Sequence, residues 1–306
     1  MNAQIRSESD SRSTLMQMLA RLAREASIEI AARDIGHVYE GRGLLAPGKK
    51  IYVNHLPGQT WKQTEAACAA IHEAGYVPVP HLPVRLLTDA ATLERTVDGF
   101  VSRAQVREVL LIAGDYPEPI GPYASVSDAM RSGLLKRNGL SAVSIAGHPE
   151  GHPKVALEEI RRAERDKVLL AAELGLEVTL LSQFFFDSRP FLQWVGELRA
   201  NGIATRVVAG LAGPVRLATL LKLAVRCGVG SSVRALASRR SSFVKLLGSY
   251  GPEPVMRDLA QALNAGETDF SGIHLFCFGG FLNTCQWLHT VAEGRFELNE
   301  SGGFDA

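Results

Sequence analysis

The sequence contains few cysteines, and none of them are spaced as a C-x-x-C pair. The four, Cys68, Cys227, Cys277 and Cys285, form no C-x-x-C motif and no cluster, so we expect neither a disulfide framework nor a structural zinc site. A G-x-x-x-x-G-K-[ST] sequence is also missing. The sequence therefore predicts no bound metal.

The chain also lacks an excess of charge and a long apolar run. It has 33 basic and 32 acidic residues and a formal net charge of +1, which gives no electrostatic reason to expect nucleic acid or an anionic membrane as a partner. No apolar run approaches the roughly 18 residues needed to span a bilayer. The first residues, MNAQIRSESDSRST, lack the apolar stretch of a signal peptide. We therefore expect a cytoplasmic enzyme, for which a homo-oligomer stays open.

The sequence does contain a regular alternation of short apolar runs with helical patterns. Its 306 residues are 46% hydrophobic and 21% charged, and no linker divides them. Eight units of strand and helix in one chain favour a closed α/β barrel, the (β/α)8 or TIM barrel, over an open sheet. The predicted strands are 27–31, 50–56, 77–82, 108–114, 142–147, 177–183, 205–210 and 273–279.

The barrel is predicted to span residues 14–298, between a disordered polar arm (1–13) and a loose tail (299–306). An additional helix, about Leu15 to Arg24, precedes the first strand. The long interval before the last strand leaves room for extra helices, for which Ser231–Ser238 and Glu253–Ala265 are candidates.

Individual residues mark where helices begin and end. Asp89 is predicted to cap one helix, and Asp187 or Ser188 to cap another. Pro214 is predicted to open a further helix that stops at Gly228. These boundaries place the loops, and therefore the expected site, after each strand.

Polar residues and glycines fall at the ends of most predicted strands, where barrel enzymes carry their chemistry. Glu29 lies between Ile28 and Ile30, and the alternation of side chains points it towards the barrel interior. Partial desolvation there should raise its pKa, which suits a general acid; a buried glutamate paired with a basic neighbour is the alternative. The strand-end residues are Glu29, Asn54, His55, His81, Gly114, Asp115, Gly147, His148, Gln183, Gly210, Phe278 and Gly279.

Three loops after strands carry further candidates. Asp115 follows Gly114 in AGDYP, where it either takes part in chemistry or caps a turn. Gln183 heads QFFFD, and its amide can pair with a lactam-like ring edge, although the phenylalanines alone would indicate simple core. GHPEGHP (147–153) holds two histidines four residues apart. Its prolines disfavour the helix that a zinc pair would need, so we interpret it as a stiff loop that grips a ligand.

The order of these motifs resembles the methylenetetrahydrofolate reductase family. SIEIA, PHL, GDYP with PYAS, GHPEGHP and SQFFFD follow one another between about Ser27 and the helix after Phe281, which is most of the chain. The resemblance implies a flavin-bearing (β/α)8 barrel. It also implies reduction of 5,10-methylenetetrahydrofolate to 5-methyltetrahydrofolate by NADH or NADPH.

The resemblance implies roles for individual residues. Glu29 matches a general acid that protonates N10 as the imidazolidine ring of the folate opens. Asp115 matches an aspartate near the flavin and the pterin, and Gln183 matches a glutamine that contacts folate and nicotinamide. The residues predicted to bind FAD are Asn54, His81, Ala113, Gly114, Asp115, Tyr123, Ala124, Gly147, His148, His152 and Lys167. Those predicted to bind the folate are Gln183, Phe185, Leu217 and Phe278.

The sequence departs from the family pattern where the flavin is concerned. Residues 31–34 replace the usual FFPP, Ala113 replaces an arginine, and only Lys167 remains of a basic cluster before QFFFD. The candidates to supply the missing charge are Arg161, Arg162 and Arg165. Three hypotheses follow: a flavin-dependent reductase, a flavin-free reductase that passes hydride directly from NADH, and a catalytically silent folate-binding partner subunit. The direction of flux, towards or from methyltetrahydrofolate, stays open.

Overall fold

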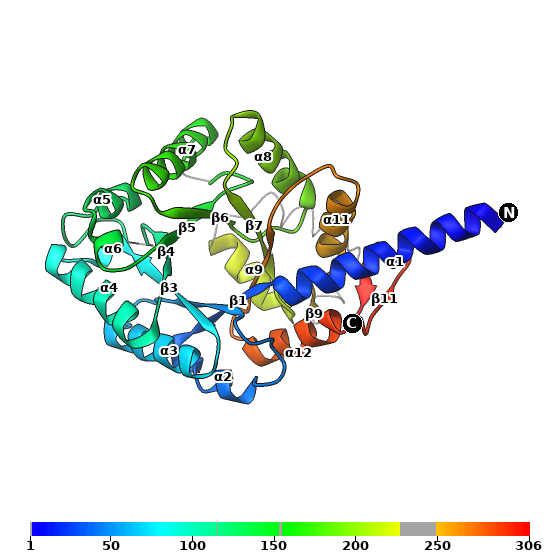
Figure 1. The fold of residues 1–306 in the computed structure, drawn as a ribbon, viewed down its shortest axis with the longest axis horizontal. Coiled ribbons are helices and arrows are strands. Elements are labelled where there is room, and N and C mark those ends of the chain that lie inside the picture. Colours follow the sequence, from blue (N-terminus) through cyan, green and yellow to red (C-terminus); the bar gives the residue numbers. More distant parts are fainter. Residues whose placement is uncertain (1, 115, 153–154, 227–248) are drawn as a thin grey trace.

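Eight parallel strands close into a barrel in the computed structural model, which describes residues 2–114, 116–152, 155–226 and 249–306 (Figure 1). Consecutive barrel strands are neighbours, and β10 closes the ring between β1 and β7. The strands are β1 (Ser27–Ala31), β2 (Lys50–Asn54), β3 (Val77–Pro83), β4 (Glu108–Ile112), β5 (Ala142–Gly147), β6 (Glu177–Ser182), β7 (Arg206–Ala212) and β10 (Gly272–Phe276). The (β/α)8 barrel predicted from the sequence is confirmed, with small differences at the strand ends.

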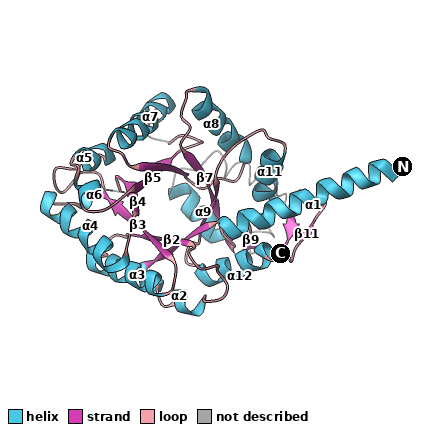
Figure 2. Cartoon of the chain, viewed as in Figure 1, coloured by secondary structure: helices cyan, strands magenta, loops and turns pink. Residues whose placement is uncertain are grey.

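Helices form an outer ring around the strands (Figure 2). Asp89 caps α4 through its carboxylate, which accepts the Thr92 amide, and Asp187 caps α8 in the same way. Both caps were predicted. The longer helices are α3 (Trp61–Glu73), α4 (Ala90–Ala104), α7 (Leu157–Glu173), α8 (Ser188–Ala200), α9 (Leu217–Arg226), α11 (Glu253–Asn264) and α12 (Phe281–Ala292). Short helices are α2 (His37–Glu40), α5 (Val126–Arg131) and α6 (Leu134–Arg137).

One of the two helices predicted between β7 and β10 is confirmed. The candidate Glu253–Ala265 corresponds to α11, whereas Ser231–Ser238 and the predicted stop at Gly228 lie outside the described residues. Between β7 and α11, the two-residue strands β8 (Val215–Arg216) and β9 (Ser249–Tyr250) pair with each other.

The N-terminal helix is longer than predicted. α1 (Asn2–Glu25) includes the residues expected to form a disordered arm, and its first half stands clear of the barrel in Figure 1. That expectation was wrong because nothing between Asn2 and Ser13 breaks a helix: the stretch contains neither proline nor glycine. At the C-terminal end of α1, the buried ammonium group of Lys49 donates hydrogen bonds to the carbonyl oxygens of Ala23, Arg24 and Ala26 at 3.2, 2.9 and 2.9 Å. A cation there satisfies carbonyls that the helix itself leaves unpaired.

The C-terminal residues are also ordered, which corrects the predicted loose tail. β11 (Glu297–Leu298) pairs with β12 (Phe304–Asp305), and Arg257 of α11 donates to the carbonyl oxygens of Asn299 and Gly303, both at 2.8 Å. Phe304 is buried between Trp287 and Phe296. Burial of one aromatic ring anchors a segment whose polar composition suggested a free end.

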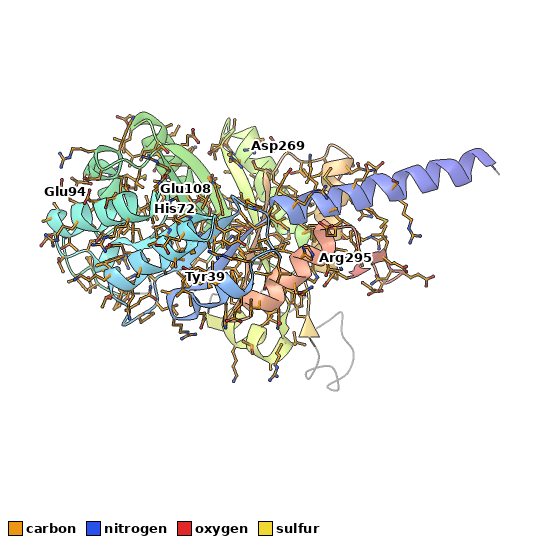
Figure 3. The ribbon with its side chains drawn as sticks, turned by 60° about the horizontal axis from the view of Figure 1, so that its bottom comes forward. Tyr39, His72, Glu94, Glu108, Asp269 and Arg295 are labelled. Carbon is orange, nitrogen blue, oxygen red and sulfur yellow. The ribbon has the colours of Figure 1, made fainter. Side chains whose placement is uncertain are left out.

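The barrel interior is filled below its mouth. Tyr52, Val79, Leu110 and Leu181 form an interior cluster, one residue from each of four strands. At the strand starts, Glu108, labelled in Figure 3, accepts hydrogen bonds from Ser144 at 2.6 Å and Tyr52 at 3.4 Å. Lys50 pairs with the same carboxylate at 2.5 Å. These contacts join β2, β4 and β5 at the end of the barrel opposite the loops that follow the strands.

The described residues contain no helix that is both long and apolar enough to cross a membrane. Cys68, Cys277 and Cys285 are buried free thiols, and Cys227 lies outside the described residues.

Candidate active site at the barrel mouth

A cavity of about 270 Å³ opens at the ends of β1, β2 and β10. Glu29, Asn54 and Phe278, three of the predicted site residues, line it together. The other lining residues are Ile30, Ala31, Arg33, Asp34, Leu56, Thr219, Cys277, Gly279 and Phe281. Thr219 belongs to the first turns of α9, so that helix covers part of the mouth (Figure 1). The cavity gives a small molecule access to a carboxyl group in the barrel wall.

Glu29 is buried as the alternation of β1 predicted. Ile28 and Ile30 pack outward in the main core, while Glu29 faces inward with 8% of its surface exposed. Burial raises the pKa of Glu29 from 4.5 to about 7, and a hydrogen bond from the side chain of Asn54 partly opposes this rise. The carboxyl group therefore carries a proton at neutral pH in a large share of molecules, as a general acid requires.

Two buried histidines lie inside the barrel, and one of them is next to this carboxyl group. His81 Nε2 lies 4.0 Å from Glu29 Oε2, and burial, together with the nearby His55, lowers the pKa of His81 to about 3. His274 Nδ1 is hydrogen-bonded to Ser27 Oγ at 2.9 Å. Burial and the nearby His81 lower the pKa of His274 to about 3. Both rings are therefore neutral, so they put no cation beside Glu29 and leave its raised pKa in place. The sequence prediction missed His274, although its position between Ile273 and Leu275 carries the same signal as Glu29.

Some buried polar atoms at the mouth have no partner within the described chain. They include Nε2 of His81 and Oδ1 of Asn54, while Nε2 of His274 is unpaired deeper in the barrel. Buried polar groups are normally hydrogen-bonded, so these atoms indicate a site that a polar ligand or water completes.

Aromatic side chains form the wall of the mouth on the side of β6, β7 and β10. Phe184 packs edge-on against Phe278 with ring centroids 5.1 Å apart, and Leu217 lies in the same cluster. Phe278 has a φ of 47°, in a region that side chains other than glycine rarely adopt. Such strain is typical of functional sites. Phe278 therefore lines the mouth cavity, and Leu217 packs in the aromatic cluster.

Phe185 was predicted to bind substrate, and the structure corrects this. Its ring stacks on Phe191 of α8 with centroids 5.0 Å apart and belongs to the core between barrel and helices. The alternation in QFFFD sends Phe184 and Phe186 to the mouth cluster and Phe185 to the opposite side. QFFFD therefore contributes Phe184 and Phe186, and not Phe185, to the aromatic wall of the mouth.

Gln183 follows β6 directly. Its side-chain oxygen accepts the Phe184 amide at 3.1 Å, and its backbone amide donates to the carbonyl of Gly147 at 2.8 Å. β6 and β1 are three strands apart in the barrel order, so Gln183 and Glu29 lie on different parts of the rim. A Cβ on Gly210 would lie 2.2 Å from the Ser182 carbonyl oxygen, so glycine is required beside this turn.

The loop after β4 is held by an arginine that the sequence prediction did not single out. Arg85 donates to the carbonyl oxygens of Tyr116 at 2.7 Å and Ala124 at 2.9 Å, and its backbone amide donates to the carbonyl of Ala113 at 3.3 Å. Gly114 has a φ of 91°, as its turn requires. Asp115, the predicted catalytic aspartate, lies outside the described residues.

Tyr123 does not face the cavity that contains Glu29. It is buried in the main core, and burial raises the pKa of its phenol, with Asp89 and Ser132 nearby. The described structure therefore gives Tyr123 a packing role in this loop.

A buried glutamate of α7 holds the start of the GHPEGHP loop in place. Glu164, 1% exposed, accepts the His148 amide at 2.8 Å and the Trp194 indole N–H at 3.0 Å. The rings of His148 and His152 meet edge to face, with centroids 6.2 Å apart. Within the described ranges no group of three or more histidine, cysteine, aspartate or glutamate side chains could hold a metal.

Fold and site together define a (β/α)8 barrel with a neutralised carboxyl group and an aromatic wall at its mouth. No family model matches the chain. The 5,10-methylenetetrahydrofolate reductase of Pectobacterium carotovorum subsp. carotovorum is 29% identical over 126 residues, covering 40% of this chain and 40% of that protein. A protein of Oryza sativa subsp. japonica named probable methylenetetrahydrofolate reductase (NADH) is 25% identical over 144 residues, covering 43% of this chain and 23% of that protein.

These alignments span less than half the length of either relative. Both relatives carry the name that the motif order predicted, which supports the resemblance. Among solved structures, the dihydropteroate synthase of Thermus thermophilus matches with a TM-score of 0.48 and 11% identity over 88% of this chain and 94% of that one. The Yersinia pestis dihydropteroate synthase matches with a TM-score of 0.47 and 10% identity over 89% and 95%.

Proposed function

We propose that this protein interconverts 5,10-methylenetetrahydrofolate and 5-methyltetrahydrofolate, with a nicotinamide cofactor as the hydride partner. The observation that carries the proposal is Glu29, a buried carboxyl group with a pKa of about 7 that lines the mouth cavity. The names of the two relatives support the same substrate class.

The reaction needs an acid because hydride is accepted only after the imidazolidine ring of the folate has opened. Opening breaks the bond between the one-carbon unit and N10 and leaves an iminium ion at N5. Glu29 delivers its proton to N10, which prevents the ring from closing again. The neutral rings of His81 and His274 preserve the protonated form of the carboxyl group before this step.

Other mouth residues orient the folate. The aromatic wall, with Phe278 in the cavity, offers a flat apolar surface for the pterin or the aminobenzoyl ring. The unpaired Oδ1 of Asn54 can accept a hydrogen bond from a ring N–H, and Gln183 offers an amide donor at the opposite rim.

The test is steady-state turnover of Glu29→Gln beside a folate-binding titration. General acid catalysis contributes about 10²–10⁴-fold, so we expect turnover to fall by that factor while folate affinity changes little, since glutamine keeps the shape of the side chain. Glu118→Gln, which changes an exposed carboxylate, is the matched control and should leave turnover unchanged. Near-normal turnover in Glu29→Gln would mean that another group or water protonates N10.

A catalytically silent folate-binding subunit is the second candidate. It would bind folate and show no turnover with NADH or NADPH in either direction. A site that only binds folate gains nothing from a buried acid with a raised pKa, so the geometry favours the enzyme.

A further inference from the structure

We infer that hydride passes directly from the nicotinamide cofactor to the folate, without a resident FAD; this rests on the proposed function. FAD carries a pyrophosphate, and tight binding of that group requires cations or free backbone amides. Among the described residues near the predicted flavin site, Lys167 is the one cation that the contacts below leave available, so the predicted flavin does not fit.

Arg161, one of the cations on α7 that could replace the missing charges, is engaged through all three of its side-chain nitrogens. Its guanidinium donates to the carbonyl oxygens of His148 and Pro149, both at 3.0 Å. It also donates to Glu164 and Glu197, both at 3.2 Å. Freeing it for a phosphate would strip the buried Glu164 of its cation and release the loop.

The other two arginines face elsewhere. Arg162 and Arg165 line a groove between α7 and α8 together with Leu198 of α8 and Ile203 beyond its end. Arg161 lines this groove as well, whereas the side chains of Arg162 and Arg165 are exposed to solvent. In the described ranges neither of the two makes the contacts with the GHPEGHP loop that Arg161 makes.

Two positions at the start of the loop are already used by the protein's own structure. The His148 amide already donates to Glu164. A Cβ on Gly147 would lie 2.3 Å from the Trp194 ring, so this glycine serves the packing of the indole and does not mark the approach of a ligand. Two features read from sequence as flavin contacts are therefore used by the protein's own structure.

Lys167 is the one predicted phosphate contact whose charge is still available in the described chain. It forms no ion pair there, and burial lowers its pKa, an effect that Glu164 partly opposes. A single half-buried lysine suits a dinucleotide that binds and leaves once per turnover, because such a cofactor needs only modest affinity. A resident flavin must stay bound between turnovers.

Direct transfer balances as a two-electron step. The C4–H bond of the reduced nicotinamide breaks, and its electron pair and hydrogen form the new C–H bond at the iminium carbon. The nicotinamide becomes oxidised and the iminium becomes the N5-methyl group. The proton that Glu29 gives to N10 comes from solvent, so each turnover consumes one reduced nicotinamide and one proton.

Three measurements on the purified full chain test this. With NADH carrying deuterium at both C4 positions, we expect one deuterium in every methyl group. A flavin would hold the hydride on N5, where it exchanges with solvent, and would lose label. We also expect intersecting initial-rate lines, because both substrates must be bound together. Added FAD should neither change the rate nor show any shift in its own visible spectrum.

A pair of variants separates binding from structure. Lys167→Met should raise the KM for NADH at least several-fold with a smaller change in kcat. Arg162→Met, in the groove between α7 and α8, should change neither. Equal effects of the two variants would remove Lys167 from the cofactor site and contradict this part of the inference.

The outcomes of these experiments distinguish a failure of direct hydride transfer from a failure of the proposed reductase function. Parallel initial-rate lines, loss of label and activation by FAD would overturn direct transfer and leave the reductase intact. Absence of turnover with NADH or NADPH, whether or not FAD is added, would overturn the proposed function and the inference with it.

Discussion

Replacing Glu29 by glutamine should change how the stability of the protein depends on pH. The carboxyl group has a pKa of about 7 in the folded protein and 4.5 in its ordinary, solvated state. Between these values the folded state binds more protons than the unfolded state, so the free energy of unfolding falls as pH rises. Each pH unit is equivalent to about 1.36 kcal/mol, so ionisation of Glu29 costs about 3 kcal/mol of stability above pH 7.

The assay is urea denaturation of wild type and Glu29→Gln across this range. Other groups titrate equally in both proteins, so the difference between the two curves isolates Glu29. We expect the variant to gain about 3 kcal/mol relative to wild type between pH 4.5 and pH 8. A difference for Glu29→Gln that does not vary with pH would refute the desolvation on which the acid role depends.

Three substitutions and one control test the packing of the fold, each by denaturant unfolding. Gly147→Ala should cost about 1–3 kcal/mol, because its Cβ would lie 2.3 Å from the Trp194 ring. Gly196→Ala, a helical position with no heavy atom within 4 Å, should be neutral or stabilise by up to about 1 kcal/mol, and equal losses at both glycines would contradict the argument. Lys49→Met should cost at least about 2 kcal/mol, since three carbonyls lose their donor; an unchanged stability would mean that water replaces it. Phe304→Ala should cost about 3 kcal/mol, whereas a tail that does not contribute to the fold would show no loss.

The fold could be predicted because the alternation of apolar and polar residues along the chain indicates its strands and helices. In β1, the alternation of Ile28, Glu29 and Ile30 fixed both the strand and the inward direction of the carboxylate, and the structure agrees on each. The helix caps at Asp89 and Asp187 are local side-chain to backbone contacts, so they too are visible in the sequence.

The rest depended on contacts between distant segments. Nothing in QFFFD alone says that Phe185 meets Phe191 of the next helix and turns away from the mouth. Arg161 looked available for a phosphate because its partners, Glu197 and the carbonyls of the GHPEGHP loop, lie far from it in the sequence or in another element. The C-terminal tail was expected to be loose because its polar composition hides the buried contact of Phe304.

The hydrogen-bonded cluster at the strand starts has a consequence for the order of events in a catalytic cycle. Tyr52, Glu108 and Ser144 are bonded to one another there, away from the mouth. Glu29 instead lines the cavity at the mouth, so a bound folate would cover the contact of the carboxyl group with solvent. We therefore expect the carboxyl group to be reprotonated after the product departs, so that proton uptake follows product release.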